Sequence, residues 1–121
     1  MSKIILVIED QEDNRRIMHD LFTSKGYKVI ESVDGLEGVN AAEAYHPDLI
    51  LMDIQLPGID GYEATRRIKA NPDLSKIPII AVTSYALSGD DIKAFKAGCD
   101  GYVTKPFSPR ELLEMVRKFL Q

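Results

Sequence analysis

The amino-acid sequence predicts an α/β domain built on a doubly wound, five-stranded parallel sheet of (βα)5 form. Strand-like and helix-like segments alternate five times along the chain, without a repeat or a low-complexity linker. Several of the strand-like runs are continuously apolar, which is typical of parallel strands covered on both faces. Right-handed crossovers between parallel strands then place helices on both sides of the sheet.

Five short apolar runs are the predicted strands, and they span residues 4–8, 27–31, 48–52, 77–82 and 101–104. The first, third and fourth are the continuous runs, so we expect them in the centre of the sheet. Helical periodicity fills the intervals. The first helix has an apolar stripe followed by Gly26 as a stop signal, and the stripe comprises Ile17, Met18, Leu21 and Phe22. The last helix has a second stripe of Leu112, Leu113, Val116, Phe119 and Leu120.

Capping signals predict where several helices begin. Asp34 and Asp60 each stand three residues before a glutamate, the spacing of a capping box. Ser108 has the same spacing and is followed by Pro109, a residue favoured in the first turn of a helix. Ser88 is a weaker start for the fourth helix, which carries fewer large apolar residues.

Length and composition indicate one globular domain over residues 1–121, without an attached output domain. The chain has 15 basic and 19 acidic residues, a formal net charge of −4, which argues against a nucleic-acid-binding surface. No apolar run approaches the roughly 20 residues that cross a bilayer. With no signal peptide after Met1, we expect a cytoplasmic protein. The single cysteine, Cys99, excludes an intrachain disulfide and a cysteine zinc site.

Polar residues gather at the carboxyl ends of the predicted strands, where doubly wound sheets form their binding crevice. Four strands end in Glu9-Asp10, Asp53, Thr83-Ser84 and Lys105-Pro106. Three carboxylates, a hydroxyl and an ammonium group are therefore expected to converge. The second strand ends in Glu31-Ser32 near the edge of the sheet and is expected to contribute nothing.

This constellation indicates magnesium-dependent phosphoryl transfer. Clustered carboxylates repel one another unless a cation lies among them, and oxygen ligands without His or Cys suit Mg²⁺ before Ca²⁺. A carboxylate such as Asp53 can itself be the nucleophile and become an aspartyl phosphate. Thr83 and Lys105 would then neutralise phosphoryl oxygens. Gly58 and Gly61 are expected to turn the following loop tightly and to leave the Asp53 carboxylate accessible, as in the printed sequence LILMDIQLPGIDG.

These residues, in this order and each at a strand end, resemble the signature of the receiver domain of bacterial two-component response regulators. The resemblance covers essentially the whole chain. The stretch PDLILMDIQLPGIDGYE is especially similar to the stand-alone cell-division regulators of this family. The resemblance implies the flavodoxin-like strand order 2-1-3-4-5.

The resemblance also implies a role for each residue of the site. Asp53 would accept the phosphoryl group from a sensor histidine kinase or a histidine phosphotransfer protein, and would help to bind Mg²⁺. Asp10 would ligate Mg²⁺ directly, Glu9 through water, and Gln55 through its backbone carbonyl. Lys105 would contact the phosphoryl oxygens, and its peptide bond to Pro106 would be cis.

Other positions would control the switch and its lifetime. By the same resemblance, Thr83 would move toward the phosphoryl group on activation while Tyr102 rotates inward. Ser84 would be the small residue beside the phosphoryl oxygens. Gln55 and Tyr85 occupy positions that tune how long the phosphate survives.

The implied function is a phosphorylation-activated signalling switch that assists its own phosphotransfer and dephosphorylation but is not an enzyme. It would signal to a downstream protein through the face of the fourth helix, fifth strand and fifth helix, as a monomer or a weak dimer through that face. Neither nucleic acid nor a membrane is an expected partner. Whether the chain is a stand-alone regulator or a domain of a longer protein stays open.

Three competing functions match part of the pattern. Aspartyl-phosphate phosphatases resemble one another in having a second aspartate two residues after the nucleophile, where this chain has Gln55. A flavodoxin-type electron carrier needs a phosphate-binding loop after the first strand, where the acidic run EDQEDNRR would repel phosphate. A degenerate receiver that acts only as an interaction module is opposed by the intact signature.

The remaining reactive and charged residues have simpler interpretations. His19 and His46 are expected to be structural or exposed, not phosphoryl donors or metal ligands. The pairs Arg15-Arg16 and Arg66-Arg67 are interpreted as solvated helix faces, although the first pair could help kinase recognition. Cys99 is expected to be partly buried, without an activated thiolate.

Overall fold

Five parallel strands form a single sheet in the order β2-β1-β3-β4-β5, which confirms the predicted fold class and strand order. The structure is a computed structural model that describes residues 2–84 and 90–121. The strands are β1 (Ile4–Ile8), β2 (Lys28–Ser32), β3 (Leu49–Asp53), β4 (Ile79–Thr83) and β5 (Gly101–Thr104).

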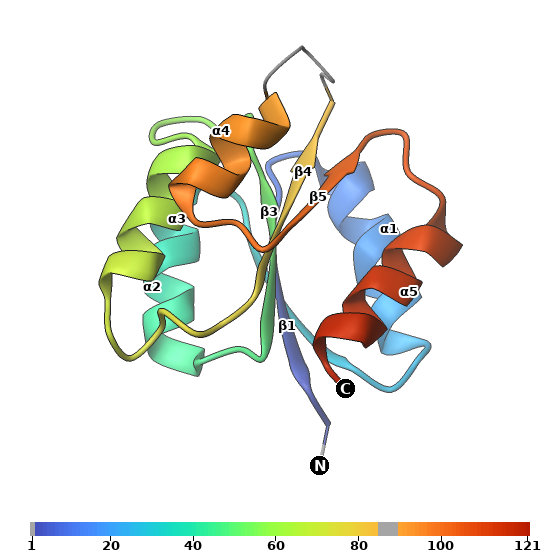
Figure 1. Cartoon of the computed structure of the whole chain (residues 1–121). Helices are drawn as coiled ribbons and strands as arrows, with labels where there is room; N and C mark the ends of the chain where they lie inside the picture. Colours follow the sequence, from blue (N-terminus) through green and yellow to red (C-terminus); the bar gives the residue numbers. More distant parts are fainter. Residues whose placement is uncertain (1, 85–89) are drawn as a thin grey trace.

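Helices cover both faces of this sheet, as the continuous apolar strands predicted. They are α1 (Glu12–Thr23), α2 (Gly35–Tyr45), α3 (Gly61–Ala70), α4 (Asp90–Ala97) and α5 (Pro109–Phe119). Figure 1 shows the sheet edge-on, with α1 and α5 on one side and α2, α3 and α4 on the other.

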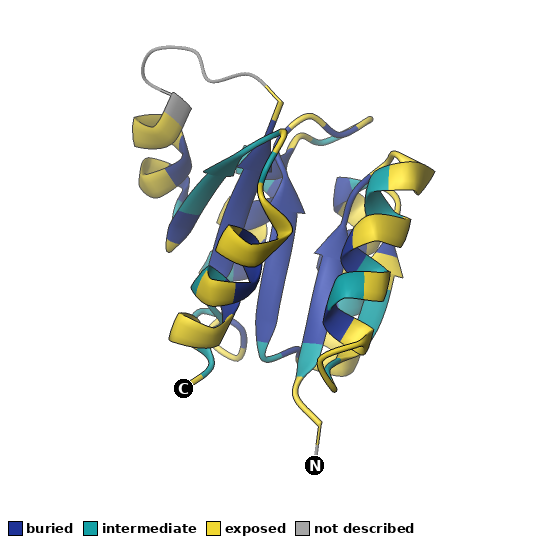
Figure 2. Cartoon of the chain, turned by 90° about the vertical axis from the view of Figure 1, so that its right-hand side faces the viewer, coloured by how far each residue is buried: buried dark blue, intermediate teal, exposed yellow. Residues whose placement is uncertain are grey.

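The core has two halves that the sheet separates. Alternate residues of β1 supply each half, because neighbouring side chains of a strand point to opposite faces. Leu6 and Ile8 pack on the side of α2 and α3, whereas Ile5 and Val7 pack against α1 and α5. Strands β3 and β4 are buried throughout, β1 is buried except at Ile4, and the outward turns of the helices are exposed (Figure 2).

Three of the predicted capping residues begin their helices. The side chains of Asp34 and Asp60 accept hydrogen bonds from the backbone N–H groups three residues later, at 2.8 and 2.9 Å. Ser108 caps α5 in the same way, at 3.4 Å. Ser88, the predicted start of the fourth helix, lies outside the described residues.

The first helix confirms its predicted stop signal and differs from its prediction at one apolar residue. It ends at Thr23, and Gly26, with φ of 90°, closes the turn that follows, in which the N–H groups of Gly26 and Tyr27 donate to the carbonyl oxygens of Thr23 and Phe22. Met18 and Phe22 are buried as expected, but Ile17 is 50% exposed. Successive helical residues are about 100° apart around the axis, so Ile17 and Met18 cannot both face the centre of the core.

Candidate functional site

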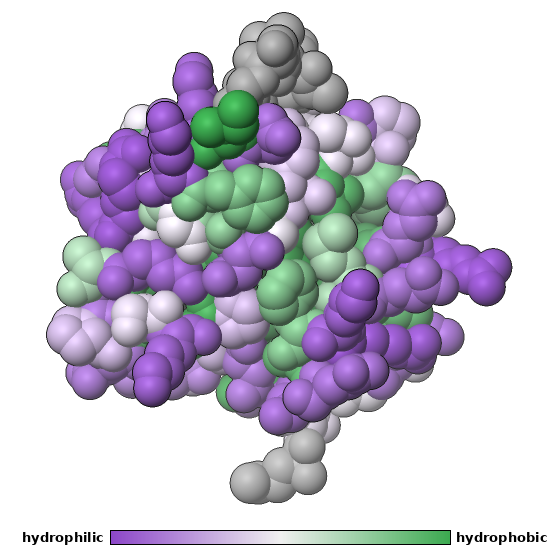
Figure 3. All heavy atoms as spheres, viewed as in Figure 1, coloured by the Kyte–Doolittle hydropathy of each residue, from purple (hydrophilic) through white to green (hydrophobic). Residues whose placement is uncertain are grey.

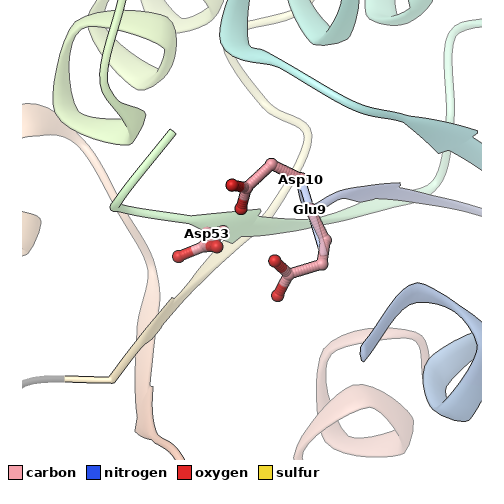
Figure 4. Close-up of side chains that lie close together, drawn as sticks. All are labelled: Glu9, Asp10 and Asp53. Carbon is pink, nitrogen blue, oxygen red and sulfur yellow. The ribbon is translucent and has the colours of Figure 1, made fainter. Parts of the chain in front are cut away.

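Three carboxylates meet where the parallel strands end, which we call the carboxyl edge of the sheet. They meet because β1 and β3 are hydrogen-bonded neighbours. Glu9 and Asp10 follow the end of β1, and Asp53 is the last residue of β3. Each can offer an oxygen atom to a group in which all the ligand atoms lie within 4.8 Å of one another. Figure 4 shows the three carboxylates close together. The structure thus brings together the acids that the strand ends predicted.

Lys105, which follows β5, supplies a cation to this cluster. Its Nζ lies 2.5 Å from Glu9 Oε1 and 3.4 Å from Asp53 Oδ2. The lysine is largely buried, with 12% of its side chain exposed. The peptide bond between Lys105 and Pro106 is cis, the geometry that the resemblance implied.

The surroundings of Glu9 raise the pKa of its carboxyl group. Burial raises the pKa of this fully buried carboxyl above its ordinary value of 4.5, and the neighbouring Asp53 carboxyl raises it further. Hydrogen bonds from Lys105 and from the Gln11 N–H lower the same pKa, but they do not cancel the other effects. One ammonium group therefore only partly compensates the clustered negative charge.

Asp53 is less accessible than predicted, with only 4% of its surface exposed. The backbone N–H of Gln55 donates to Asp53 Oδ1 at 3.1 Å, and Lys105 lies against the other oxygen. Gly61 explains how the next helix comes so close. A Cβ at Gly61 would lie 2.3 Å from the Asp53 backbone oxygen, so only glycine fits there.

The acidic loop comprises residues 9–11, directly after β1. Its backbone is held by contacts that the sequence did not predict. Arg15 Nη1 donates to the carbonyl oxygens of Glu9 and Asp10, each at 3.0 Å. The interpretation of Arg15 as a solvated residue is therefore wrong, because its guanidinium satisfies loop carbonyls. Glu31 and Ser32 were expected to contribute nothing, but the Glu9 N–H donates to the Ser32 oxygen at 3.0 Å and Glu31 pairs with Arg15.

The remaining predicted site residues surround the acids less directly. Thr83 ends β4 and is buried, and Tyr102 of β5 is half-buried against the core on the α2 and α3 side. Ser84 is exposed and shares with Lys105 the lining of a groove of about 480 Å³. The predicted role of Tyr85 falls outside the described residues.

The other reactive side chains lie apart from the site. His46 is exposed and ends α2 in a left-handed conformation, with φ of 47°. His19 Nδ1 lies 3.2 Å from Glu31 Oε2, between α1 and β2. Cys99 is buried next to Thr65, and this burial raises the pKa of its thiol, so the thiolate is not activated.

The ligand set fits a hard cation. It consists of carboxylate oxygens, and within the described residues neither His nor Cys joins the cluster. Such oxygen ligands suit Mg²⁺, which binds proteins through one or two carboxylates and keeps positions for phosphate oxygens. A nucleophilic carboxylate, a metal-binding group of acids and a lysine are the parts that phosphoryl transfer needs.

A sheet of this topology, with these acids and a lysine at its carboxyl edge, defines the receiver domain of two-component response regulators. The profile of the response regulator receiver domain family matches residues 5–117, and the chain belongs to this family. The polar-differentiation response regulator DivK of Brucella ovis is 41% identical to it over 120 residues, which cover 99% of this chain and 98% of DivK.

Solved structures agree with the family. The receiver domain of a sensor histidine kinase from Pseudomonas aeruginosa has a TM-score of 0.92 and 38% identity, and covers 99% of this chain and 98% of that one. That structure has a magnesium ion coordinated in its active-site cleft. A response regulator from Chloroflexus aurantiacus has a TM-score of 0.95 at 29% identity, with 99% and 98% of the two chains covered. Among the described residues of the present chain, no helix combines the length and apolar composition needed to cross a membrane.

Proposed function

We propose that this chain is a phosphorylation-operated switch in which Asp53 accepts a phosphoryl group from a histidine kinase or phosphotransfer protein. The observation that carries the proposal is the single cluster formed by Glu9, Asp10 and Asp53, with Lys105 Nζ 3.4 Å from Asp53 Oδ2. A general acid is missing at the position where a phosphatase would need it, because residue 55 is glutamine. This disfavours the phosphatase alternative.

The residues that would hold Mg²⁺ are Asp10, Asp53, the backbone carbonyl of Gln55, and Glu9 through water. Asp10 is the exposed member of the acidic group, whereas Glu9 is fully buried and already bound to Lys105. This difference supports a direct role for Asp10 and an indirect one for Glu9. A bound Mg²⁺ ion would neutralise charge on the phosphoryl oxygens. The magnesium ion in the active-site cleft of the Pseudomonas receiver supports a metal site in this cleft, without identifying its ligands.

The transfer step needs little more than positioning. An oxygen of Asp53 donates an electron pair to phosphorus and forms the O–P bond, while the N–P bond of the phosphohistidine breaks and its electron pair returns to the imidazole. Lys105, which is already held at the site by Glu9, would move to contact the phosphoryl oxygens. Thr83 and Ser84 would lie beside them at the end of β4.

The response would pass to the face formed by α4, β5 and α5, with Thr83 and Tyr102 as the moving side chains. Ile92 and Phe95 of α4 are 55% and 51% exposed, and Phe119 of α5 is 37% exposed. Figure 3 shows hydrophobic residues gathered in the middle of this face, with hydrophilic residues on both sides. Exposed apolar area of this kind supports a protein partner or a second copy. Gln55 and Tyr85 would set the phosphate lifetime.

The kinase would dock beside the phosphoacceptor. A groove of about 480 Å³ opens there, and Lys105 lines it together with the half-exposed Ile17 and with Phe107 and Pro109. An apolar groove that reaches the catalytic lysine supports docking of an apolar helix face that carries the phosphohistidine.

The match over 99% of this chain and 98% of DivK supports a receiver domain over residues 1–121. The protein would then be a regulator and not an enzyme. It would assist only the phosphorylation and dephosphorylation of its own Asp53. Neither nucleic acid nor membrane has a place in this function.

Phosphorylation of Asp53 can be tested with acetyl phosphate and Mg²⁺, and with beryllofluoride as a phosphoryl mimic. We expect NMR shifts in β4, α4 and β5 of the wild type and none in Asp53→Asn. Asp60→Asn is the matched control, because it makes the same chemical change at an exposed helix cap where asparagine also caps well. A full response of Asp53→Asn, or no response of the wild type, would refute the proposal.

A further inference from the structure

One peptide unit of the acidic loop is held at both ends. The carbonyl oxygen of Asp10 accepts a hydrogen bond from Arg15 Nη1 at 3.0 Å, and the N–H of Gln11 donates to Glu9 Oε2 at 3.1 Å. These two groups belong to the same planar peptide and point in opposite directions. Arg15 therefore orients the N–H group that holds the carboxylate of Glu9.

The other oxygen of Glu9 extends this chain of contacts into the site. Glu9 Oε1 lies 2.5 Å from Lys105 Nζ, which in turn approaches Asp53. A guanidinium on the peptide carbonyl also polarises the N–H at its far end and strengthens that hydrogen bond. A contact outside the acidic cluster thus fixes the orientation of a carboxylate within it.

Arg15 is itself held by the neighbouring edge strand. Its Nε lies 3.5 Å from Glu31 Oε1, and only 16% of its side chain is exposed. Glu31 is in β2, next to the loop whose Glu9 N–H donates to Ser32. The adjacent Arg16 has no such setting, since it is 71% exposed and pairs with Glu12 one turn away.

We propose that Arg15 is a positioning residue of the magnesium site and that it acts through the Asp10–Gln11 peptide on the carboxylates of Glu9 and Asp10. The proposal rests on the function proposed above. Groups that orient metal ligands without touching the metal typically change metal affinity about 10–100-fold. Because Arg15 acts through a backbone peptide, we expect removal of its side-chain charge to weaken Mg²⁺ binding by about tenfold, the lower end of this range.

The experiment compares wild type with Arg15→Gln, Arg15→Lys and the control Arg16→Gln. Mg²⁺ affinity is measured by NMR titration, and the initial rate of phosphorylation is measured with acetyl phosphate. This small donor needs no docking surface, so an effect of α1 on kinase recognition cannot contribute. All measurements are made under conditions in which urea denaturation curves show each variant to be folded.

The expected pattern is specific. Arg15→Gln weakens Mg²⁺ binding and slows phosphorylation at subsaturating Mg²⁺, Arg15→Lys restores part of both, and Arg16→Gln resembles wild type. Amide hydrogen exchange of Gln11 accelerates in metal-free Arg15→Gln. Glu31→Gln has a smaller effect, which is not additive with that of Arg15→Gln because the two residues share one chain of contacts.

Wild-type Mg²⁺ affinity in Arg15→Gln, or an equal loss in Arg16→Gln, would overturn the positioning role. If the wild type itself binds no Mg²⁺, the proposed function fails first. The two failures are therefore distinguishable.

Discussion

Acidic residues lie both where the parallel strands begin, the amino edge of the sheet, and where they end, the carboxyl edge. The two groups of acids have different roles. At the amino edge, Asp48 accepts a hydrogen bond from the Ile4 N–H at 2.7 Å, and Asp100 accepts one from the Ile79 N–H at 2.9 Å. Lys69 also donates to Asp100, so the charge of this carboxylate is paired. At the carboxyl edge, three acids share one nearby lysine, Lys105.

The direction of parallel strands explains the contrast. Their amino ends present N–H groups, which a carboxylate can satisfy, whereas their carboxyl ends present carbonyl oxygens, which it cannot. Acids at the amino edge therefore complete the hydrogen bonding of the fold. Acids at the carboxyl edge add repulsion that a cationic ligand can relieve. Substitutions at the two edges should consequently separate stability from metal binding.

The largest change in stability is expected at the amino edge, from Asp100→Ala. This variant leaves the buried N–H of Ile79 without its acceptor and removes the ion pair with Lys69. We expect the free energy of unfolding to fall by about 2–3 kcal/mol, measured by urea denaturation and circular dichroism. Mg²⁺ affinity should remain that of the wild type.

Asp73→Ala is the control for this edge, because Asp73 is exposed and its side chain has no hydrogen bond or ion pair in the described part of the chain. Its stability should be nearly unchanged. If Asp100→Ala were as stable as Asp73→Ala, the acids of the amino edge would not have the structural role assigned to them.

The opposite result is expected at the carboxyl edge, from Glu9→Gln. The pKa of Glu9 is raised, so folding disfavours its charged form, and a neutral amide removes that cost. In EDTA we expect the variant to gain stability, within the about 0.5–2 kcal/mol typical of stabilising substitutions. Thermal unfolding in EDTA and in excess Mg²⁺ measures both effects, since a tightly bound ligand raises the melting temperature.

With Mg²⁺ present, the wild type should recover more stability than Glu9→Gln does, because the variant lacks one carboxylate of the site. A loss of stability in EDTA would mean that the contact between Glu9 and Lys105 outweighs the cost of burying the carboxylate. The contrast between the two edges would then fail.

The fold and the acids of the site were predictable because both depend on local sequence. Continuous apolar runs identified buried parallel strands, and strands in such a sheet bring their ends together. Asp53 and Lys105 therefore met as predicted, although they are 52 positions apart. The capping residues Asp34 and Asp60 were equally local signals, since cap and N–H are three residues apart.

The supporting contacts were not predictable in the same way. Arg15 belongs to a helix with other charged residues, and its contact with loop carbonyls depends on the exact path of the backbone. Glu31 matters only because β2 lies beside β1. The burial of Asp53 likewise depends on the close approach of α3 at Gly61.

The smallest effect is expected for Glu63, a half-exposed carboxylate at neither edge. Arg67 and Arg66 donate to it at 2.9 and 3.1 Å, and these hydrogen bonds lower the pKa of Glu63 below its ordinary value of 4.5. A carboxyl with a lowered pKa in the folded state stabilises the protein fully above its unfolded value. That contribution disappears as the pH falls from about 4.5 through the folded value.

Glu63→Gln should therefore be slightly less stable than wild type at neutral pH, and the difference should vanish in acid. Added salt should reduce it as well, because exposed ion pairs are screened. Urea denaturation at several pH values measures the difference, with Glu43→Gln as a control, since Glu43 is exposed and has no ion pair within the described ranges. If the difference in free energy of unfolding persists below the folded pKa of Glu63, packing of the Glu63 side chain against the two arginines, and not its charge, stabilises the protein. The charge of this carboxylate, unlike that of the acids at the sheet edges, would then contribute no measurable free energy.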